Sequence, residues 1–334
     1  MRRIRIIAEV GVNHNRSLTM AKEMIDIAAE AGADIVKFQA AIPTEVVTAY
    51  AEKAAYQKVQ TPASESQLEM TRKLHFDLDA FHELKEYCGI KGIEYLVTSF
   101  GPESSSFVLS QKPSLVKIPS GEITNVPYLR RLALTDVEII LSTGMATLDE
   151  VEFAINTLVD AGQKRDGITL LHCTTEYPTP YNGVNLNAIS TMRKYFGLEV
   201  GISDHSNGII IPIASVAMGA SVIEKHFTLD KSLAGPDHKA SLEPDELIAM
   251  VKAIRNIEVS MGDGKKFPTV TEMQNMTSIR KSIVASKNII SGEMLTEFNL
   301  TTKRPGNGLS PIFWDAAIGT RAIKDFEVDE QIVL

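Results

Sequence analysis

Eight short apolar runs, each followed by a helical pattern, constrain the fold of this chain more than any other feature. They occupy residues 4–10, 35–39, 95–98, 115–118, 137–142, 168–173, 200–203 and 222–224. The runs are mostly apolar on both faces, as expected of parallel strands that are covered on both sides. Between them lie stretches with apolar residues at helical spacing, such as 18–31 and 148–162. Eight such units predict an α/β fold, a parallel (β/α)8 TIM barrel, rather than an open sheet.

The chain after the last run indicates a second, smaller domain. Residues 244–261 have a helical pattern with acidic residues in the first turn and Gly262 after the end. Further on, short strand-like runs at 283–285 and 295–300 lie between turn sequences, and such a small domain would be marginal alone. Within the barrel, the polar segment 43–78 is too long for a plain connection and is expected to cross one face. The expected domains are a barrel at 1–262, a linker at 263–280 and a mostly-β domain at 281–334.

The charge balance argues against two classes of partner. The formal net charge is −8, whereas nucleic acid or an anionic membrane would select for a basic surface. The two cysteines, Cys88 and Cys173, both lie in apolar surroundings, which predicts free thiols and a reducing compartment. The first apolar run is too short for a signal peptide, and no run approaches the ~18 residues of a membrane span. We therefore expect a cytoplasmic protein.

Polar or ionisable residues stand at the end of every predicted strand. They are Glu9; Lys37 and Gln39; Thr98; Lys117 with Ser120 and Glu122; Ser142 and Thr143; Thr174, Thr175 and Tyr177; Ser203 and His205; Glu224 and His226. Any one of them alone would more often be a solvated residue. In this fold, however, active sites form at the carboxyl ends of the strands, and the interior register otherwise favours branched apolar residues. The whole set therefore predicts an active site.

The histidines at the ends of the last two strands indicate a metal site. Imidazole is the commonest side-chain ligand of divalent transition metals, and His205 and His226 occupy matching positions on neighbouring strands. Two ligands on one ion would leave coordination positions open for a substrate. The alternative is that each histidine is a hydrogen-bonded residue at a strand end.

Lysines and hydroxyl groups at the same rim predict an anion site. Lys37 and Lys117, together with the hydroxyls of Ser120, Ser142 and Ser203, suit a phosphate plus a carboxylate. Glycines in the loops after two of these strands could bring backbone N–H groups to the anion, or could only close tight turns. Glu9 and Asp237 add carboxylates that could bind sugar hydroxyls or handle protons, although carboxylates in loops such as that of Asp237 are commonly turn formers.

These motifs, taken together and in order, resemble the sialic acid synthase family. The matching segments are residues 9–15, 36–39, 117–122, 142–145, 172–174, 177–178, 203–205, 224–227 and 235–237. Residues 303–308 are similar to the antifreeze-like (SAF) domain attached to those enzymes. The resemblance covers the chain from residue 4 to its end. Within the family, the chain looks most similar to bacterial synthases of legionaminic acid and of N-acetylneuraminic acid.

The resemblance implies condensation of phosphoenolpyruvate with an N-acetylmannosamine-type sugar, with loss of phosphate. His205 and His226 would hold Mn²⁺ or Mg²⁺, which acts as a Lewis acid, and Glu122 would position or deprotonate the attacking water. Phosphoenolpyruvate would be bound by Lys37, Thr98, Lys117, Ser120, Ser142 and Ser203. The sugar would be bound by Glu9, Gln39, Tyr177 and Asp237, with Arg304 of a partner subunit on its N-acetyl group. A domain-swapped homodimer follows from that last role. The expected sugar is 2,4-diacetamido-2,4,6-trideoxymannose, and N-acetylmannosamine is the alternative.

Three positions depart from the family pattern. Thr175 stands where asparagine is frequent, Ser99 where proline is frequent, and Arg16 where glycine is usual. Thr175 is therefore not expected to contact the phosphate, and Arg16 could alter the lining of the sugar pocket.

Two other functions compete with this interpretation. A Schiff-base aldolase could use Lys37, Lys117 or Lys225 as its amine, and borohydride trapping would reveal it. A sugar- or ice-binding protein could use the small domain and keep the barrel as a scaffold. A scaffold, however, has no reason to keep two histidines and two lysines at strand ends.

Overall fold

The chain folds into two compact units, Met1–Asp263 and Gly264–Leu334, in a computed structural model. The structure describes residues 3–54, 57–58, 61–62, 64–134 and 137–334. Each unit has its own buried hydrophobic cluster. No helix in these ranges is long and apolar enough to cross a membrane.

The first unit is a closed barrel of eight parallel strands in sequence order, which confirms the predicted fold. The strands are β1 (Arg5–Gly11), β2 (Ile35–Ala41), β3 (Glu94–Phe100), β4 (Leu115–Ile118), β5 (Glu138–Ser142), β6 (Ile168–Cys173), β7 (Glu199–Asp204) and β8 (Val222–His226). β8 pairs with β1 and so closes the sheet without an exposed edge. The strand cores match the apolar runs, and most of the strands extend one or two residues beyond them.

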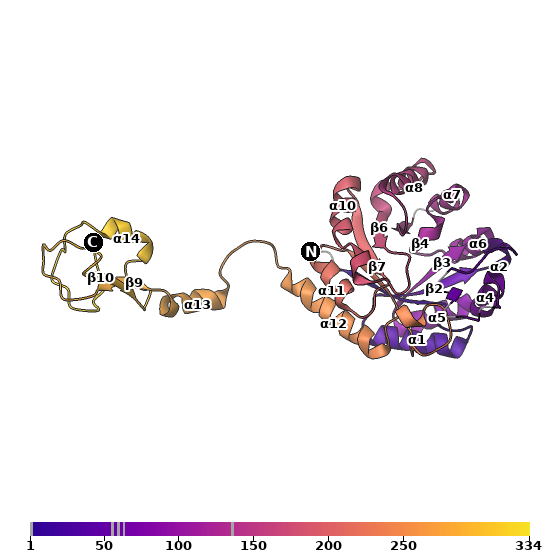
Figure 1. Cartoon of the computed structure of the whole chain (residues 1–334), viewed down its shortest axis with the longest axis horizontal. Coiled ribbons are helices and arrows are strands. Elements are labelled where there is room, and N and C mark those ends of the chain that lie inside the picture. The colour runs from indigo at the N-terminus through magenta and orange to yellow at the C-terminus, as the bar shows by residue number, and fades with distance from the viewer. Residues whose placement is uncertain (1–2, 55–56, 59–60, 63, 135–136) are drawn as a thin grey trace. The chain divides into compact units, whose positions relative to one another are not determined.

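Helices connect the strands and surround them (Figure 1). They are α1 (Leu18–Glu30), α2 (Pro43–Val46), α4 (Gln67–Leu74), α5 (Ala80–Lys91), α6 (Pro102–Ser110), α7 (Val126–Ala133), α8 (Leu148–Asp160), α9 (Tyr181–Val184), α10 (Asn187–Phe196), α11 (Ile210–Ala217) and α12 (Pro244–Ser260), with the 3-10 turns η1 (Ser120–Glu122), η2 (Arg165–Gly167) and η3 (His238–Ala240). Their apolar faces pack against the outside of the strands and form the larger hydrophobic cluster. The segment expected to cross one face carries α2 and α4.

A separate apolar layer fills the inside of the barrel. Its members are Ile7, Ile35, Leu96, Leu115, Ile140, Leu171 and Val222, one from each of seven strands. Side chains of a strand return to the same face every second residue. Two residues further along, the same strands carry Glu9, Lys37, Thr98, Lys117, Ser142, Cys173 and Glu224. A hydrophobic floor therefore lies directly beneath a layer of polar side chains at the carboxyl ends of the strands.

The remaining strand, β7, has a glycine in the apolar layer. A Cβ atom at Gly201 would lie 2.3 Å from the carbonyl oxygen of Val222 and 2.8 Å from Cδ2 of Leu171. Only glycine therefore lets β7 approach its neighbours this closely. Two residues later, Ser203 completes the polar layer.

The second unit contains α13 (Val270–Ile279), β9 (Ser282–Ala285), β10 (Leu300–Lys303), η4 (Pro311–Phe313) and α14 (Trp314–Ala317). β9 and β10 form an antiparallel two-stranded sheet. α13 lies within the stretch predicted to be a linker, and it begins with a capping box between Thr269 and Glu272. The predicted strand at 295–300 is wrong, because β10 begins only at Leu300. The preceding residues form a turn in which the Asn299 side chain accepts a hydrogen bond from the Thr296 backbone N–H.

Candidate active site

A cavity of about 290 Å³ opens at the carboxyl ends of the barrel strands. Most of the predicted site residues line it: Glu9, Lys37, Gln39, Thr98, Lys117, Ser120, Ser142, Tyr177, Ser203, His205, His226 and Asp237. The strand register explains their meeting, since Glu9 is paired with both Lys37 and His226, and Ser203 with Glu224. Residues far apart in sequence thus share one level of the barrel.

The centre of the cavity is a buried carboxylate between two lysines. Glu224 Oε1 lies 3.2 Å from Lys117 Nζ, and Glu224 Oε2 lies 3.4 Å from Lys37 Nζ. Ser203 donates a hydrogen bond of 2.7 Å to Glu224 Oε1, and Lys37 donates one of 3.3 Å to Thr98 Oγ1. All of these side chains are nearly inaccessible to solvent. Glu224 thus contacts both lysines in a buried site, and Lys37 has a second carboxylate partner in Glu9.

Burial and the paired charges shift the pKa values of this cluster in different directions. Burial alone would raise the pKa of Glu224, but Lys117 and Lys37 outweigh it and hold that pKa far below its usual range. Burial lowers the pKa of Lys117, and the attraction of Glu224 only partly opposes it. For Lys37, burial is outweighed by Glu224 and Glu9, so its pKa is raised. Of the nearby carboxylates, Glu224 is therefore the one that most favours the charged form of both lysines.

Two further carboxyl groups lie on the sugar side predicted from sequence. Glu9 contacts Lys37 Nζ at 2.9 Å and accepts a hydrogen bond of 2.8 Å from the Gln39 amide. Burial is the main cause that raises the pKa of Asp237 to about 7, and the nearby Glu9 carboxylate adds to it. Asp237 can therefore carry a proton at neutral pH, unlike an ordinary aspartate.

The two predicted metal ligands lie close together with suitable protonation. The ring centroids of His205 and His226 are 5.4 Å apart, and Tyr177 stacks on His205 at 4.0 Å. His205 Nδ1 contacts the carbonyl oxygen of Thr174 at 2.6 Å, which fixes the ring and directs Nε2 away from that carbonyl. His226 Nδ1 is buried and has no hydrogen-bond partner among the described residues.

Burial keeps both imidazoles neutral, as metal ligands must be. It lowers the pKa of His205 to about 4 and takes the pKa of His226 well below its usual value. No group of three or more His, Cys, Asp or Glu side chains suited to a metal occurs in the described ranges. The residues therefore fit a divalent ion held by two neutral nitrogens, with its other positions left to substrate and water.

A glycine brings two of the predicted hydroxyl loops together. Gly144 has a φ of +49°, and a Cβ atom there would lie 2.4 Å from Cβ of Ser120 and 2.9 Å from Oγ1 of Thr175. Thr175, one of the departures from the family pattern, thus packs beside this glycine. The loop after β5 can approach the loop after β4 only because this residue lacks a side chain.

Replacing Gly144 with alanine should lower the free energy of unfolding by about 1–3 kcal/mol, because the residue is both strained and crowded. The Michaelis constant for the anionic substrate should rise as well, since Ser120 is displaced. Denaturant unfolding and steady-state kinetics measure the two effects. Gly121→Ala is the matched control, because no atom lies within 4 Å of a Cβ built there. Equal effects of the two substitutions would contradict the prediction.

Two predicted residues are not part of the cavity lining. Glu122 lies in η1, and its Oε2 accepts a hydrogen bond of 2.5 Å from the Asn125 side chain. Arg304 belongs to the second unit, where its Nε donates to the carbonyl oxygen of Ile279. Lys225, one amine of the aldolase alternative, is also outside the lining, and its ammonium group pairs with Asp204 at 2.6 Å.

Glu224 has a central place in the site, whereas the sequence predicts it only as a polar residue at a strand end. Its register position opposite Ser203, two residues beyond the apolar Val222, was the available signal. The α4 residues Gln67 and Met70 also line the cavity. They lie in the long polar segment, where no strand pattern points to the barrel mouth.

The fold and the site together define a class. A (β/α)8 barrel with two buried lysines, a bridging carboxylate and two neutral histidines at its carboxyl rim is an enzyme for an anionic substrate. The chain matches the NeuB family over residues 24–266 and the SAF domain over residues 280–334.

The chain is 51% identical, over 99% of both chains, to N,N'-diacetyllegionaminic acid synthase of Campylobacter jejuni. It is 43% identical to the enzyme of the same name from Legionella pneumophila, over 95% of this chain and 89% of that one. Among solved structures, the N-acetylneuraminic acid synthetase of Leptospira borgpetersenii is 32% identical with a TM-score of 0.71, over 82% of this chain and 90% of that one. The chain belongs to the NeuB family, as the sequence motifs predicted.

Proposed function

We propose that this enzyme condenses phosphoenolpyruvate with 2,4-diacetamido-2,4,6-trideoxymannose and water to give N,N'-diacetyllegionaminate and phosphate. The cluster of Lys37, Glu224 and Lys117 beside two neutral histidines, in one cavity, is the observation that carries the proposal. Full-length identity of 51% to a synthase of that product supports the choice of sugar.

The two lysines bind the anionic substrate. Phosphoenolpyruvate carries a carboxylate and a phosphate, and Lys37 and Lys117 present ammonium groups on neighbouring parts of the same cavity. In a buried site these charges act with little screening. Ser120, Ser142 and Ser203 offer hydroxyl donors around them. Binding therefore places the enol carbon in a cavity whose other wall carries the sugar-side groups.

The reaction forms one carbon–carbon bond and breaks one carbon–oxygen bond. The C3 carbon of phosphoenolpyruvate attacks the aldehyde carbon of the open-chain sugar, and the aldehyde oxygen takes up a proton. Water adds to the cationic C2 carbon and loses a proton. The C2–O bond to phosphate then breaks, phosphate leaves, and the remaining hydroxyl loses its proton to give the ketone.

Asp237 is the proposed donor of the proton to the aldehyde oxygen. Its pKa of about 7 means that a proton is present at neutral pH and can be given up. Glu9 and Gln39, which are bonded to each other, offer polar groups for the sugar hydroxyls. Glu122 lies outside the cavity lining and remains the proposed residue for positioning the attacking water. If it has this role, Glu122→Gln should release phosphate more slowly than the wild-type enzyme.

Replacing Asp237 with asparagine should lower kcat/KM by about 100-fold, because general acids typically contribute factors of this size. In the wild-type enzyme, kcat/KM should fall as the pH rises through about 7, since the donor loses its proton there. That limb should be absent in Asp237→Asn. Asp230→Asn, in the same loop region, is the control. A limb of unchanged position in Asp237→Asn would contradict the assignment.

The metal proposed for His205 and His226 is Mn²⁺ or Mg²⁺. When bound, such an ion supplies Lewis-acid polarisation of the aldehyde. His205 and His226 supply neutral nitrogen ligands, and Tyr177 packs against both rings.

The buried free thiols of Cys88 and Cys173 support a reducing compartment, and we propose the cytoplasm.

We further propose a homodimer in which Arg304 completes the site of the partner subunit. Arg304→Ala and His226→Ala should each be inactive alone. Mixed under conditions of subunit exchange, they should regain about a quarter of the wild-type sites, because random pairing makes half the dimers mixed and each mixed dimer has one intact site. No recovery in dimers that demonstrably exchange would refute the swapped arrangement.

Phosphate release by chelator-treated enzyme, before and after Mn²⁺ is restored, tests the function. We expect metal-dependent release with phosphoenolpyruvate and the diacetamido sugar, and a much lower kcat/KM with N-acetylmannosamine. The reverse preference would establish a sialic acid synthase. No release with either sugar would refute the proposed reaction. Borohydride should leave the enzyme active, because the proposed chemistry contains no Schiff base.

A further inference from the structure

The helix α4 presents one face to the active-site cavity. Gln67, Met70, Thr71 and Leu74 all line the cavity, at the spacing that places residues on one side of a helix. The opposite side, with Arg72 and Lys73, is exposed. This face lies on an insertion between β2 and β3, outside the strand ends that carry the reacting groups.

The cavity face of α4 has an unused hydrogen-bonding atom beside apolar side chains. The side-chain Oε1 of Gln67 is buried and has no hydrogen-bond partner among the described residues. A buried acceptor of this kind costs free energy until a donor arrives. Met70 and Leu74, one and two turns along the same face, offer apolar contact. An acetamido group carries an N–H donor and, beyond its carbonyl, a methyl group, so it can satisfy both.

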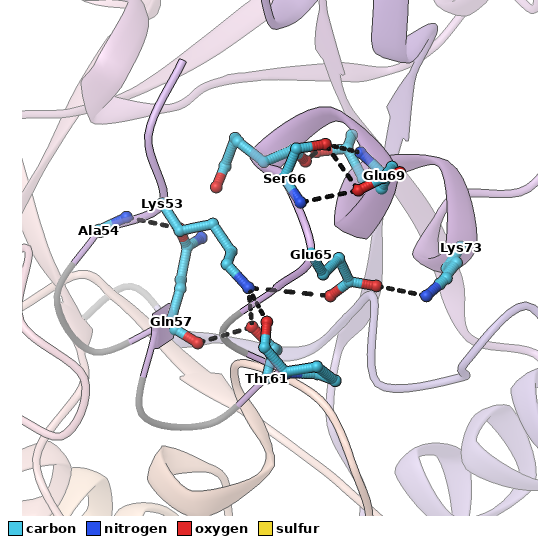
Figure 2. Close-up of polar contacts among 11 residues, drawn as sticks. Lys53, Ala54, Gln57, Thr61, Glu65, Ser66, Glu69 and Lys73 are labelled. Carbon is cyan, nitrogen blue, oxygen red and sulfur yellow. Dashed lines mark hydrogen bonds and ion pairs between the residues drawn. The ribbon is translucent and has the colours of Figure 1, made fainter. Parts of the chain in front are cut away.

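A buried lysine anchors the beginning of this helix (Figure 2). The Lys53 side chain is 3% exposed. Its Nζ donates to Thr61 Oγ1 at 2.9 Å and to the carbonyl oxygen of Pro62 at 2.6 Å, and lies 3.9 Å from Glu65 Oε2. The other oxygen of Glu65 contacts Lys73 on α4 at 2.5 Å. Through Glu65, Lys53 therefore links the segment that precedes α4 to the last turn of that helix.

We propose that this face of α4 is the subsite for the second acetamido group of the sugar, at C4. Gln67 is the specificity-determining residue, and Lys53 is a positioning residue that acts through Glu65. The inference rests on the proposed function and adds the recognition of one substituent. The C2 acetamido group is attached beside the reacting aldehyde, whereas the C4 group is two carbons further from it. The C4 group is therefore the one that reaches a wall outside the strand ends.

Gln67→Leu tests the subsite with two sugars. The first is the diacetamido sugar, and the second is 2-acetamido-2,4,6-trideoxymannose, which has only hydrogen at C4. The substitution should raise the Michaelis constant for the first sugar about 10- to 100-fold with kcat little changed, because a hydrogen bond in a buried site is lost. The constant for the second sugar, measured by turnover or by competitive inhibition, should not change. Equal effects on both sugars, or no effect on either, would overturn the proposal.

Lys53→Met should shift the same ratio between the two sugars in the same direction, and Lys53→Arg should restore part of it. Lys58→Met is the matched control, since Lys58 is exposed and pairs only with Glu52 in the described residues. A Lys53→Met enzyme that loses activity equally with both sugars would show a merely structural role and overturn the positioning assignment. Failure of the wild-type enzyme with every sugar would instead refute the proposed function, so the two failures are distinguishable.

Discussion

His226→Ala should reduce phosphate release by about 1,000-fold or more, since the residue supplies one of only two predicted protein ligands for the metal. His226 is buried and neutral, and its Nδ1 has no hydrogen-bond partner among the described residues. The substitution therefore removes a nitrogen that is available to bind a metal ion, and not only a packed ring. Direct binding of Mn²⁺, measured by equilibrium dialysis, should weaken in parallel. This second readout separates loss of the ion from loss of the catalytic step.

His82→Ala is the control for that experiment, because His82 is an exposed histidine outside the cavity lining, with its ring centroid 5.1 Å from that of Phe107. It should bind Mn²⁺ and release phosphate as the wild-type enzyme does. Unchanged Mn²⁺ binding in His226→Ala, in a protein that is still folded by circular dichroism, would contradict the assignment of the ligand.

Glu224→Gln should lower kcat/KM for phosphoenolpyruvate by about 100- to 1,000-fold and also destabilise the fold. Without this carboxylate, burial lowers the pKa of Lys117 unopposed by its main partner, and the ammonium group needed for the anion is lost at a lower pH. In the Asp237→Asn background, where the limb near pH 7 is absent, the remaining alkaline limb of kcat/KM should therefore move to lower pH when Glu224 is replaced. Removing one member of a buried ion-pair cluster should also cost about 3–5 kcal/mol of unfolding free energy.

Steady-state kinetics across pH and denaturant unfolding measure these two effects. Glu199→Gln is a suitable control, because Glu199 is an exposed residue at the beginning of the neighbouring strand β7. It should change neither quantity. If Glu224→Gln left that alkaline limb in place, Glu224 would not be the group that maintains the charge of Lys117.

Much of the barrel could be predicted because each strand repeats one local rule. An apolar residue such as Ile35 faces the barrel interior, and the next residue on the same face, Lys37, is polar. The period of two and the strand ends are both visible in sequence. That is why the predicted residues on the strands were brought into one cavity.

The parts that escaped prediction depend on contacts between distant segments. The role of Glu224 follows from two lysines on other strands, which no local pattern pairs with it. Gln67 reaches the cavity through a helix in a long polar segment that also contains the buried Lys53. In the second unit, the side chain of Asn299 favoured a turn over the strand that the apolar pattern indicated.

The apolar floor of the barrel has a consequence for how such an enzyme can diversify. The seven residues of that floor contribute burial, and the polar residues one step above them contribute chemistry. A substitution in the upper layer removes little hydrophobic contact, so a change of substrate made away from the cluster of Lys37, Lys117 and Glu224 carries a small penalty in folding. Adaptation to new sugars can therefore proceed at the rim, and in α4, while the stability of the barrel is inherited unchanged.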